Sequence, residues 1–112
     1  METTRQNKIS RLVQKDLGEI FQSKSRELFN GSMITVTKVY VTKDLSLAKI
    51  YLSLFSTADK NVLLEKIRTN TREIRRELGN RVKHQLRIIP ELQFFLDDSL
   101  DYIDNIENLL KS

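Results

Sequence analysis

Several residue types that build catalytic and metal sites are absent from this sequence or nearly so. None of its 112 residues is cysteine or tryptophan, and its one histidine is His84. Without cysteine, a disulfide framework, a thiolate zinc site and a cysteine nucleophile are excluded. A single histidine also excludes a histidine-rich metal site and most catalytic triads. The sequence therefore predicts neither a metal site nor catalytic residues.

Glycine and long apolar runs are scarce as well. The three glycines stand far apart, at positions 18, 31 and 79, so no glycine-rich loop can cradle a nucleotide phosphate. No apolar stretch approaches the roughly 20 residues of a membrane helix, and the polar start of the chain lacks the apolar core of a secretory signal. We therefore expect a cytoplasmic protein with no membrane partner. We also expect a monomer that is not an enzyme and has no cofactor or small-molecule substrate.

The overall composition is that of one soluble globular domain. Apolar residues make up 39% and charged residues 30% of the chain, which is too apolar for a disordered protein. A length of 112 residues leaves no room for a second domain.

Charge is divided unevenly along the chain, although the net charge is only +4. Residues 66–87 contain eight basic and two acidic residues, a balance of 8 − 2 = +6. Residues 91–107 contain six acidic residues and no basic one, a balance of −6. A basic surface suits a polyanion, whereas an acidic segment suits a basic protein or masks the basic surface. The alternative is that both segments are merely solvated faces.

Hydrophobic periodicity predicts a helix followed by a β-hairpin. A capping box at Thr3–Gln6 begins a helix of about 20 residues. Its predicted apolar face consists of Ile9, Leu12, Val13, Leu17, Ile20 and Phe21. β-Branched residues predict a strand over Met33–Val41, alternation predicts another over Leu47–Phe55, and the short polar turn at 42–46 joins them.

Helical spacing returns in the middle of the chain. A helix start signal ends at Asp59, and Val62, Leu63 and Ile67 form the first apolar face. Ile74, Leu78 and Val82 continue that face at a spacing of four residues. A second start signal, beginning at Asn70, leaves two alternatives. The helix either runs through, or breaks there and restarts with Asn70 as its cap.

Proline ends this helical region. Pro90 favours an extended chain before it, and Leu92, Phe94 and Leu96 alternate as in a third strand. A last short helix is expected with Leu100, Ile103, Ile106 and Leu110 as its apolar positions. The predicted fold class is α+β, in the order α-β-β-α-α-β plus the terminal helix. The predicted sheet is three-stranded and mixed, with helices on one face.

Binding of RNA is the chemistry for which the sequence is best supplied. Arginine forks bind phosphate oxygens bidentately, and helical spacing aligns Arg72, Arg75, Arg76 and Lys83 around Gly79. A missing side chain at Gly79 would allow close approach of a phosphate, although a weak helix position explains it too. These charges are expected to be exposed and to contribute little to folding. The candidate RNA-contact residues are Arg72, Arg75, Arg76, Gly79, Arg81, Lys83, His84 and Arg87, with Arg5, Lys8, Arg11, Lys38 and Lys43 as secondary contacts.

Four segments, taken in order, resemble the ribosome-binding factor A family. They are Asn7–Leu12, the hairpin Ile34–Tyr51, the run Ile74–Arg81, and Leu86–Phe94 with Asp97–Ser99. Together they extend over about residues 5–99. The family usually shows Ala-x-Gly just before the Ile-Arg run, whereas this chain has Asn70, Thr71 and Arg72.

The resemblance implies a fold, a function and partners. The fold would be a single KH type II-like domain over residues 1–99, followed by a short acidic helix or tail over residues 100–112. The family binds the free 30S subunit late in its maturation and acts in processing of the 16S rRNA precursor. Its contacts lie near the 5′ end and the decoding region of that RNA. The alternative function is a protein–protein adaptor that docks through the acidic C-terminal helix.

Overall fold

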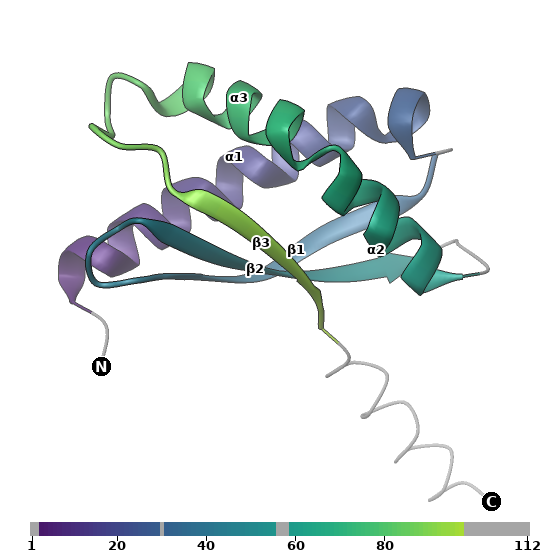
Figure 1. Ribbon diagram of the computed structural model, residues 1–112, viewed down its shortest axis with the longest axis horizontal. Coiled ribbons are helices and arrows are strands. Elements are labelled where there is room, and N and C mark those ends of the chain that lie inside the picture. Colours follow the sequence, from purple (N-terminus) through teal and green to yellow (C-terminus); the bar gives the residue numbers. More distant parts are fainter. Residues whose placement is uncertain (1–2, 30, 56–58, 98–112) are drawn as a thin grey trace, which may run out of the picture.

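The computed structural model describes residues 3–29, 31–55 and 59–97 and contains six regular elements (Figure 1). In chain order they are α1 (Thr4–Leu28), β1 (Met33–Val41), β2 (Leu47–Phe55), α2 (Lys60–Thr69), α3 (Thr71–Val82) and β3 (Glu91–Leu96). The predicted order α-β-β-α-α-β is confirmed. The expected C-terminal helix and the expected domain boundary at residue 99 lie outside the described residues.

The three strands form one mixed sheet with β2 in the centre. β1 pairs with β2 in antiparallel orientation, and β3 pairs with β2 in parallel, from Leu47 opposite Glu91 to Leu52 opposite Leu96. The even-numbered residues 48–54 of β2 are fully or almost fully buried. They lie on the face that the three helices cover (Figure 1). The predicted mixed sheet with helices on one face is therefore confirmed.

A β-bulge at Thr37 changes which residues of β1 face the helices. Val36 pairs with Leu52 and Lys38 with Tyr51, which leaves Thr37 without a partner in the ladder. Before the bulge the even-numbered Val36 faces the helices, and after it the odd-numbered Val39 and Val41 do. An extra residue shifts the two-residue period of a strand by one. The bulge thus turns Lys38 away from the core.

The capping box predicted at the start of α1 is confirmed. The Thr3 hydroxyl accepts a hydrogen bond from the amide of Gln6 at 3.1 Å, and the Gln6 side chain accepts one from the amide of Thr3 at 2.9 Å. The buried Gln6 amide group also donates to the carbonyl of Val41 at 2.9 Å. The first turn of α1 is thereby fixed to the end of β1. The helix has 25 residues, about one turn more than expected.

The helix α2 begins where expected but buries a different set of residues. The Asp59 carboxylate caps it by accepting from the amides of Asn61 and Val62. Val62, however, is 64% exposed, and Leu63, Leu64 and Ile67 form the buried face. The prediction that Val62 belongs to the core is wrong because this helix has a narrow apolar stripe, and Val62 lies on its opposite side.

The helical region breaks at Asn70, as one of the two alternatives predicted, but the cap differs. The Asn70 side chain makes no hydrogen bond to the start of α3. Its amide nitrogen instead donates to the carbonyl of Lys66 at 2.8 Å, in the last turn of α2. The idea that Asn70 caps the second helix is therefore wrong, because its side chain satisfies a carbonyl of the first.

Candidate nucleic-acid interface

The predicted basic arc on α3 lines a groove between this helix and the segment that leads into β3. Arg72, Arg75, Arg76 and Gly79 lie on its helical side, and Ile88 and Ile89 lie on the other. The groove has a volume of about 690 Å³. The structure thus brings together four of the residues that the sequence singles out.

Within this arc, the two neighbours Arg75 and Arg76 have different surroundings. The Arg75 guanidinium donates to the carbonyl of Pro90 at 3.0 Å and to the carbonyl of Ile89 at 2.7 Å. Arg76 makes no hydrogen bond or ion pair within the described residues and is exposed. Arg75 therefore holds the segment before β3 in place, whereas the charge of Arg76 is available to a ligand.

Gly79 faces the side chain of Ile89. A Cβ atom added at Gly79 would lie 3.4 Å from Cγ1 of Ile89, which is ordinary van der Waals contact. A Cβ atom would therefore fit beside Ile89, and the packing of the segment before β3 against α3 does not itself require glycine. An approach of phosphate at Gly79 stays a prediction.

The flank of α3 that faces α1 is occupied by ion pairs. Arg81 lies 2.6 Å from the carboxylate of Glu19 and 3.7 Å from that of Asp16. Lys24 of α1 reaches Glu77 at 2.9 Å and Glu73 at 3.5 Å, and the hydrogen bond to Glu77 raises the pKa of Lys24. Two acidic groups of α1 therefore surround Arg81, and a contact of Arg81 with RNA phosphate stays a prediction.

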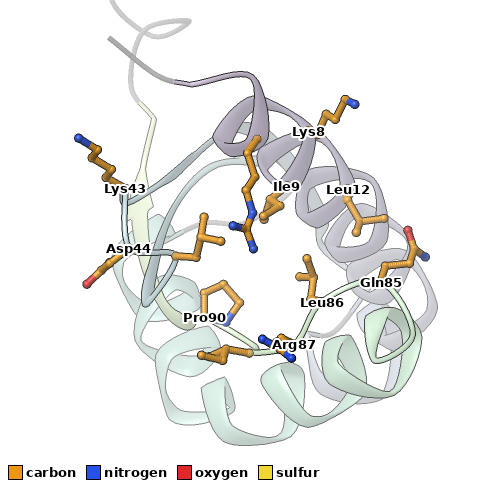
Figure 2. Close-up of a pocket in the computed structure, with 12 residues that line it drawn as sticks. Lys8, Ile9, Leu12, Lys43, Asp44, Gln85, Leu86, Arg87 and Pro90 are labelled. Carbon is orange, nitrogen blue, oxygen red and sulfur yellow. The ribbon is translucent and has the colours of Figure 1, made fainter.

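A second hollow gathers basic residues that are far apart in the sequence. The cleft lies between the start of α1, the β1–β2 turn and the segment before β3, and its volume is about 580 Å³ (Figure 2). Arg5, Lys8, Lys43 and Arg87 line it, opposed only by Asp44 among the lining residues. These four cations make no hydrogen bond or ion pair within residues 3–29, 31–55 and 59–97.

Figure 2 shows how polar and apolar groups are distributed around this cleft. Lys8 and Lys43 extend outward on either side, and Arg87 lies between Pro90 and Leu86. Aliphatic side chains, among them Ile9 and Leu12, complete the walls. The hollow thus combines an apolar interior with basic groups, as ligand pockets of about 300–1,000 Å³ do.

The acidic residue of the cleft is satisfied by its own turn. The Asp44 carboxylate accepts hydrogen bonds from the Thr42 hydroxyl at 2.7 Å and from the hydroxyl and amide of Ser46 at 2.8 and 3.1 Å. The bond from Thr42 and then those from Ser46 lower the pKa of Asp44. Asp44 is therefore ionised at neutral pH, and its carboxylate is bound by its own turn and makes no ion pair with a cation of the cleft in the described part of the chain.

The remaining candidate residues lie outside both hollows. Lys83 and His84 are exposed in the turn after α3, and Arg11 is exposed on α1. Lys38 points away from the core on the sheet face opposite the helices. The structure describes no group of three His, Asp or Glu side chains placed to hold a metal ion. In the same part of the chain, no helix has the length and apolarity needed to cross a membrane.

Two lining residues escaped the sequence analysis. Ile88 is 67% exposed between the groove and the cleft, and Leu45 lines the cleft from the β1–β2 turn with a φ of 63°. The sequence does indicate that one of the adjacent residues Ile88 and Ile89 is exposed, because two neighbouring residues in an extended segment cannot both face the core. Nothing in the sequence indicates the left-handed conformation of Leu45.

Comparison with known sequences relates nearly the whole chain to one family. The family model described as ribosome-binding factor A matches residues 5–110. The chain is 44% identical over 110 residues to ribosome-binding factor A of Cytophaga hutchinsonii, covering 98% of this chain and 83% of that relative. It is 50% identical to the Flavobacterium johnsoniae protein of the same name, with coverage of 98% and 85%.

Solved structures share the fold. The crystal structure of ribosome-binding factor A from Thermus thermophilus matches with a TM-score of 0.69 at 22% identity, over 81% of this chain and 94% of that one. A homology model of the Thermus thermophilus protein, fitted into the cryo-EM map of its complex with the 30S subunit, matches with a TM-score of 0.63 at 24% identity. The match covers 80% of this chain and 91% of that one.

Proposed function

This chain belongs to the ribosome-binding factor A family, and on this premise we propose that it is an assembly factor that binds the free 30S ribosomal subunit. The observation that carries the proposal is the similarity to proteins of that name, at 44–50% identity over 98% of the chain. Binding falls late in subunit maturation, and processing of the 16S rRNA precursor depends on it. The contacts lie near the 5′ end and the decoding region of the RNA.

Phosphate groups of rRNA are the ligands that the two basic hollows suit. Arg72 and Arg76 on the groove, and the four cations of the cleft, have no carboxylate partner in the described part of the chain. A polyanion can therefore bind them without first displacing an internal acid. Such contacts position a protein on RNA and recognise the shape of the backbone rather than its sequence.

The protein acts in this proposal by occupying the immature subunit, not by catalysis. It works as a monomer in the cytoplasm and needs no cofactor. The second candidate function is an adaptor that docks on a basic protein through its acidic C-terminal helix or tail, residues 100–112. The observation that favours it is the charge of residues 91–107, which include six acidic residues and no basic one.

Sedimentation of the tagged protein with cell lysate in a sucrose gradient tests the proposal. The protein is expected to migrate with free 30S particles and not with 70S ribosomes. Ribonuclease treatment of the lysate should abolish that migration. An adaptor would keep its partner after the RNA is digested, and migration at the top of the gradient would contradict the proposed function.

A further inference from the structure

The exposed side chain of Ile88 stands between the two basic hollows. It lines both the groove on α3 and the cleft beside α1, and it is 67% exposed. Arg72 and Arg76 lie on one side of it, and Arg5, Lys43 and Arg87 lie on the other. The two hollows and the isoleucine between them therefore form one tract, which we call the Ile88 tract.

The outward position of Ile88 is imposed by the residues around it. The carbonyls of the two residues that follow, Ile89 and Pro90, accept the hydrogen bonds of Arg75 at 2.7 and 3.0 Å. Ile89 packs against Gly79, and Pro90 is buried. These contacts hold the two residues that directly follow Ile88, and an inward turn of Ile88 would disturb them. The apolar side chain is thus presented to a ligand in a fixed place.

The charge of the tract is almost entirely positive. Its cleft side contains four basic residues and one acid, Asp44, which is bound within its own turn. Its groove side contains three arginines and one acid, Glu91. Arg75 is engaged with backbone carbonyls, but the other cations have no partner in the described residues. An anionic chain that crosses Ile88 meets unpaired positive groups before and after it.

The β1–β2 turn supplies a second sign that the cleft is a site. Leu45 adopts a φ of 63°, and its side chain lines the cleft. This left-handed conformation is strained for a residue with a side chain, and such strain is concentrated at functional sites. A glycine would remove the strain but also part of the apolar wall. The turn therefore has a leucine at a position where the backbone conformation favours glycine, and this leucine forms part of the apolar wall of the cleft.

We propose that the Ile88 tract binds an unpaired segment of RNA, an inference that rests on the proposed function and specifies the form of the RNA. Phosphates contact the cations of the groove and the cleft, Ile88 packs between two successive bases, and one base enters the cleft. Only a single strand can do this, because the bases of an A-form duplex are stacked inside it and its deep groove is too narrow for side chains. Apolar side chains, isoleucine included, insert as wedges between neighbouring bases in proteins that bend duplex DNA, and an unpaired RNA segment offers its bases to such a side chain without first being opened.

Replacement of Ile88 by serine, with a matched control, tests the proposal. Val62 on α2 is 64% exposed and lines neither hollow, so Val62→Ser removes an equally exposed apolar group elsewhere. Fluorescence anisotropy should compare a single-stranded RNA with a duplex of the same length for both variants. Ile88→Ser is expected to weaken single-strand binding about fivefold to tenfold and to leave duplex binding unchanged. Val62→Ser should change neither, and circular dichroism should show both variants folded.

Three outcomes would overturn the assignment of unpaired RNA. The first is an unchanged single-strand affinity for Ile88→Ser, and the second is an equal loss for single strand and duplex. The third is loss of 30S binding by Ile88→Ser with RNA affinity unchanged, which would assign Ile88 to a protein contact. In each case the wild-type protein would still migrate with 30S particles. Failure of the wild-type protein to do so is a different result and contradicts the proposed function itself.

Discussion

Replacement of Arg75 by alanine should destabilise the fold, whereas replacement of its neighbour Arg76 should not. The Arg75 guanidinium donates to the carbonyls of Ile89 and Pro90 at 2.7 and 3.0 Å. Arg76 has no hydrogen bond or ion pair within the described residues. The two residues are adjacent on one helix and chemically identical, so each is the control for the other.

The size of the effect follows from these two bonds. Hydrogen bonds from a charged donor contribute about 1.5–3 kcal/mol when buried. Arg75 is exposed and water can replace it at the carbonyls, so we expect about 1–2 kcal/mol for both bonds together. Arg76→Ala should stay within about 0.5 kcal/mol of the wild type, as is usual for surface positions. For a domain near 100 residues, the melting temperature should fall by about 4–8 °C per kcal/mol with Arg75→Ala.

Urea unfolding followed by circular dichroism measures this difference. A lower midpoint with an unchanged slope is expected for Arg75→Ala, because the mutation changes stability and not the area exposed on unfolding. Equal midpoints for Arg75→Ala and Arg76→Ala would refute the reasoning, since the contacts to Ile89 and Pro90 would then contribute nothing. The same result would remove the reason for regarding Ile88 as held in place.

Three further predictions concern the RNA contacts, the helix junction and the β1–β2 turn. The logarithm of RNA affinity should fall with the logarithm of salt concentration with a slope of about −4 for five phosphate contacts, and a slope of zero in a titration would exclude an electrostatic interface. Asn70→Ala and Asn70→Asp should both lower the urea midpoint, because each lacks the amide donor to the Lys66 carbonyl; an undisturbed Asn70→Asp would instead support a cap on α3. The pKa of Asp44 lies below its ordinary value because Thr42 and Ser46 donate hydrogen bonds to its carboxylate. The ionised carboxylate therefore stabilises the fold at any pH above the unfolded pKa of about 3.9. This contribution is lost as the pH falls through the folded pKa. The difference in unfolding free energy between wild type and Asp44→Asn should therefore shrink on acidification from pH 7 to pH 3, and a constant difference would contradict this.

Most of the fold could be predicted from the sequence because its local signals agree with one another. The capping box at Thr3, the alternation in β2 and the break at Asn70 each depend on neighbouring residues. The bulge at Thr37 was not predicted, although the spacing of three residues between Val36 and Val39 indicates it. Val62 was misplaced because the predicted apolar face was drawn too wide: Val62 lies on the side of α2 opposite the buried Leu63, Leu64 and Ile67.

The candidate site was predicted less completely, because residue type does not show which charges are already paired. Arg75 and Arg76 look alike in the sequence, and only the position of the segment before β3 distinguishes them. Arg81 looks like a member of the basic surface until Asp16 and Glu19 of α1 are found beside it. The grouping of Arg5, Lys43 and Arg87 in one cleft requires the tertiary fold.

Affinity for purified 30S subunits after charge reversal in the groove tests the central claim most directly. The variant Arg72→Glu with Arg76→Glu alters two exposed, unpaired cations, and Lys15→Glu with Arg26→Glu makes the same change in net charge at two exposed cations outside both basic hollows. We predict that the first variant keeps its melting transition and loses 30S binding, and that cells carrying only this variant accumulate 16S rRNA precursor. The control variant should bind nearly as the wild type does. If the groove variant stays folded and binds 30S subunits with unchanged affinity, the basic arc is only a solvated face, and the contact surface must lie elsewhere on the protein.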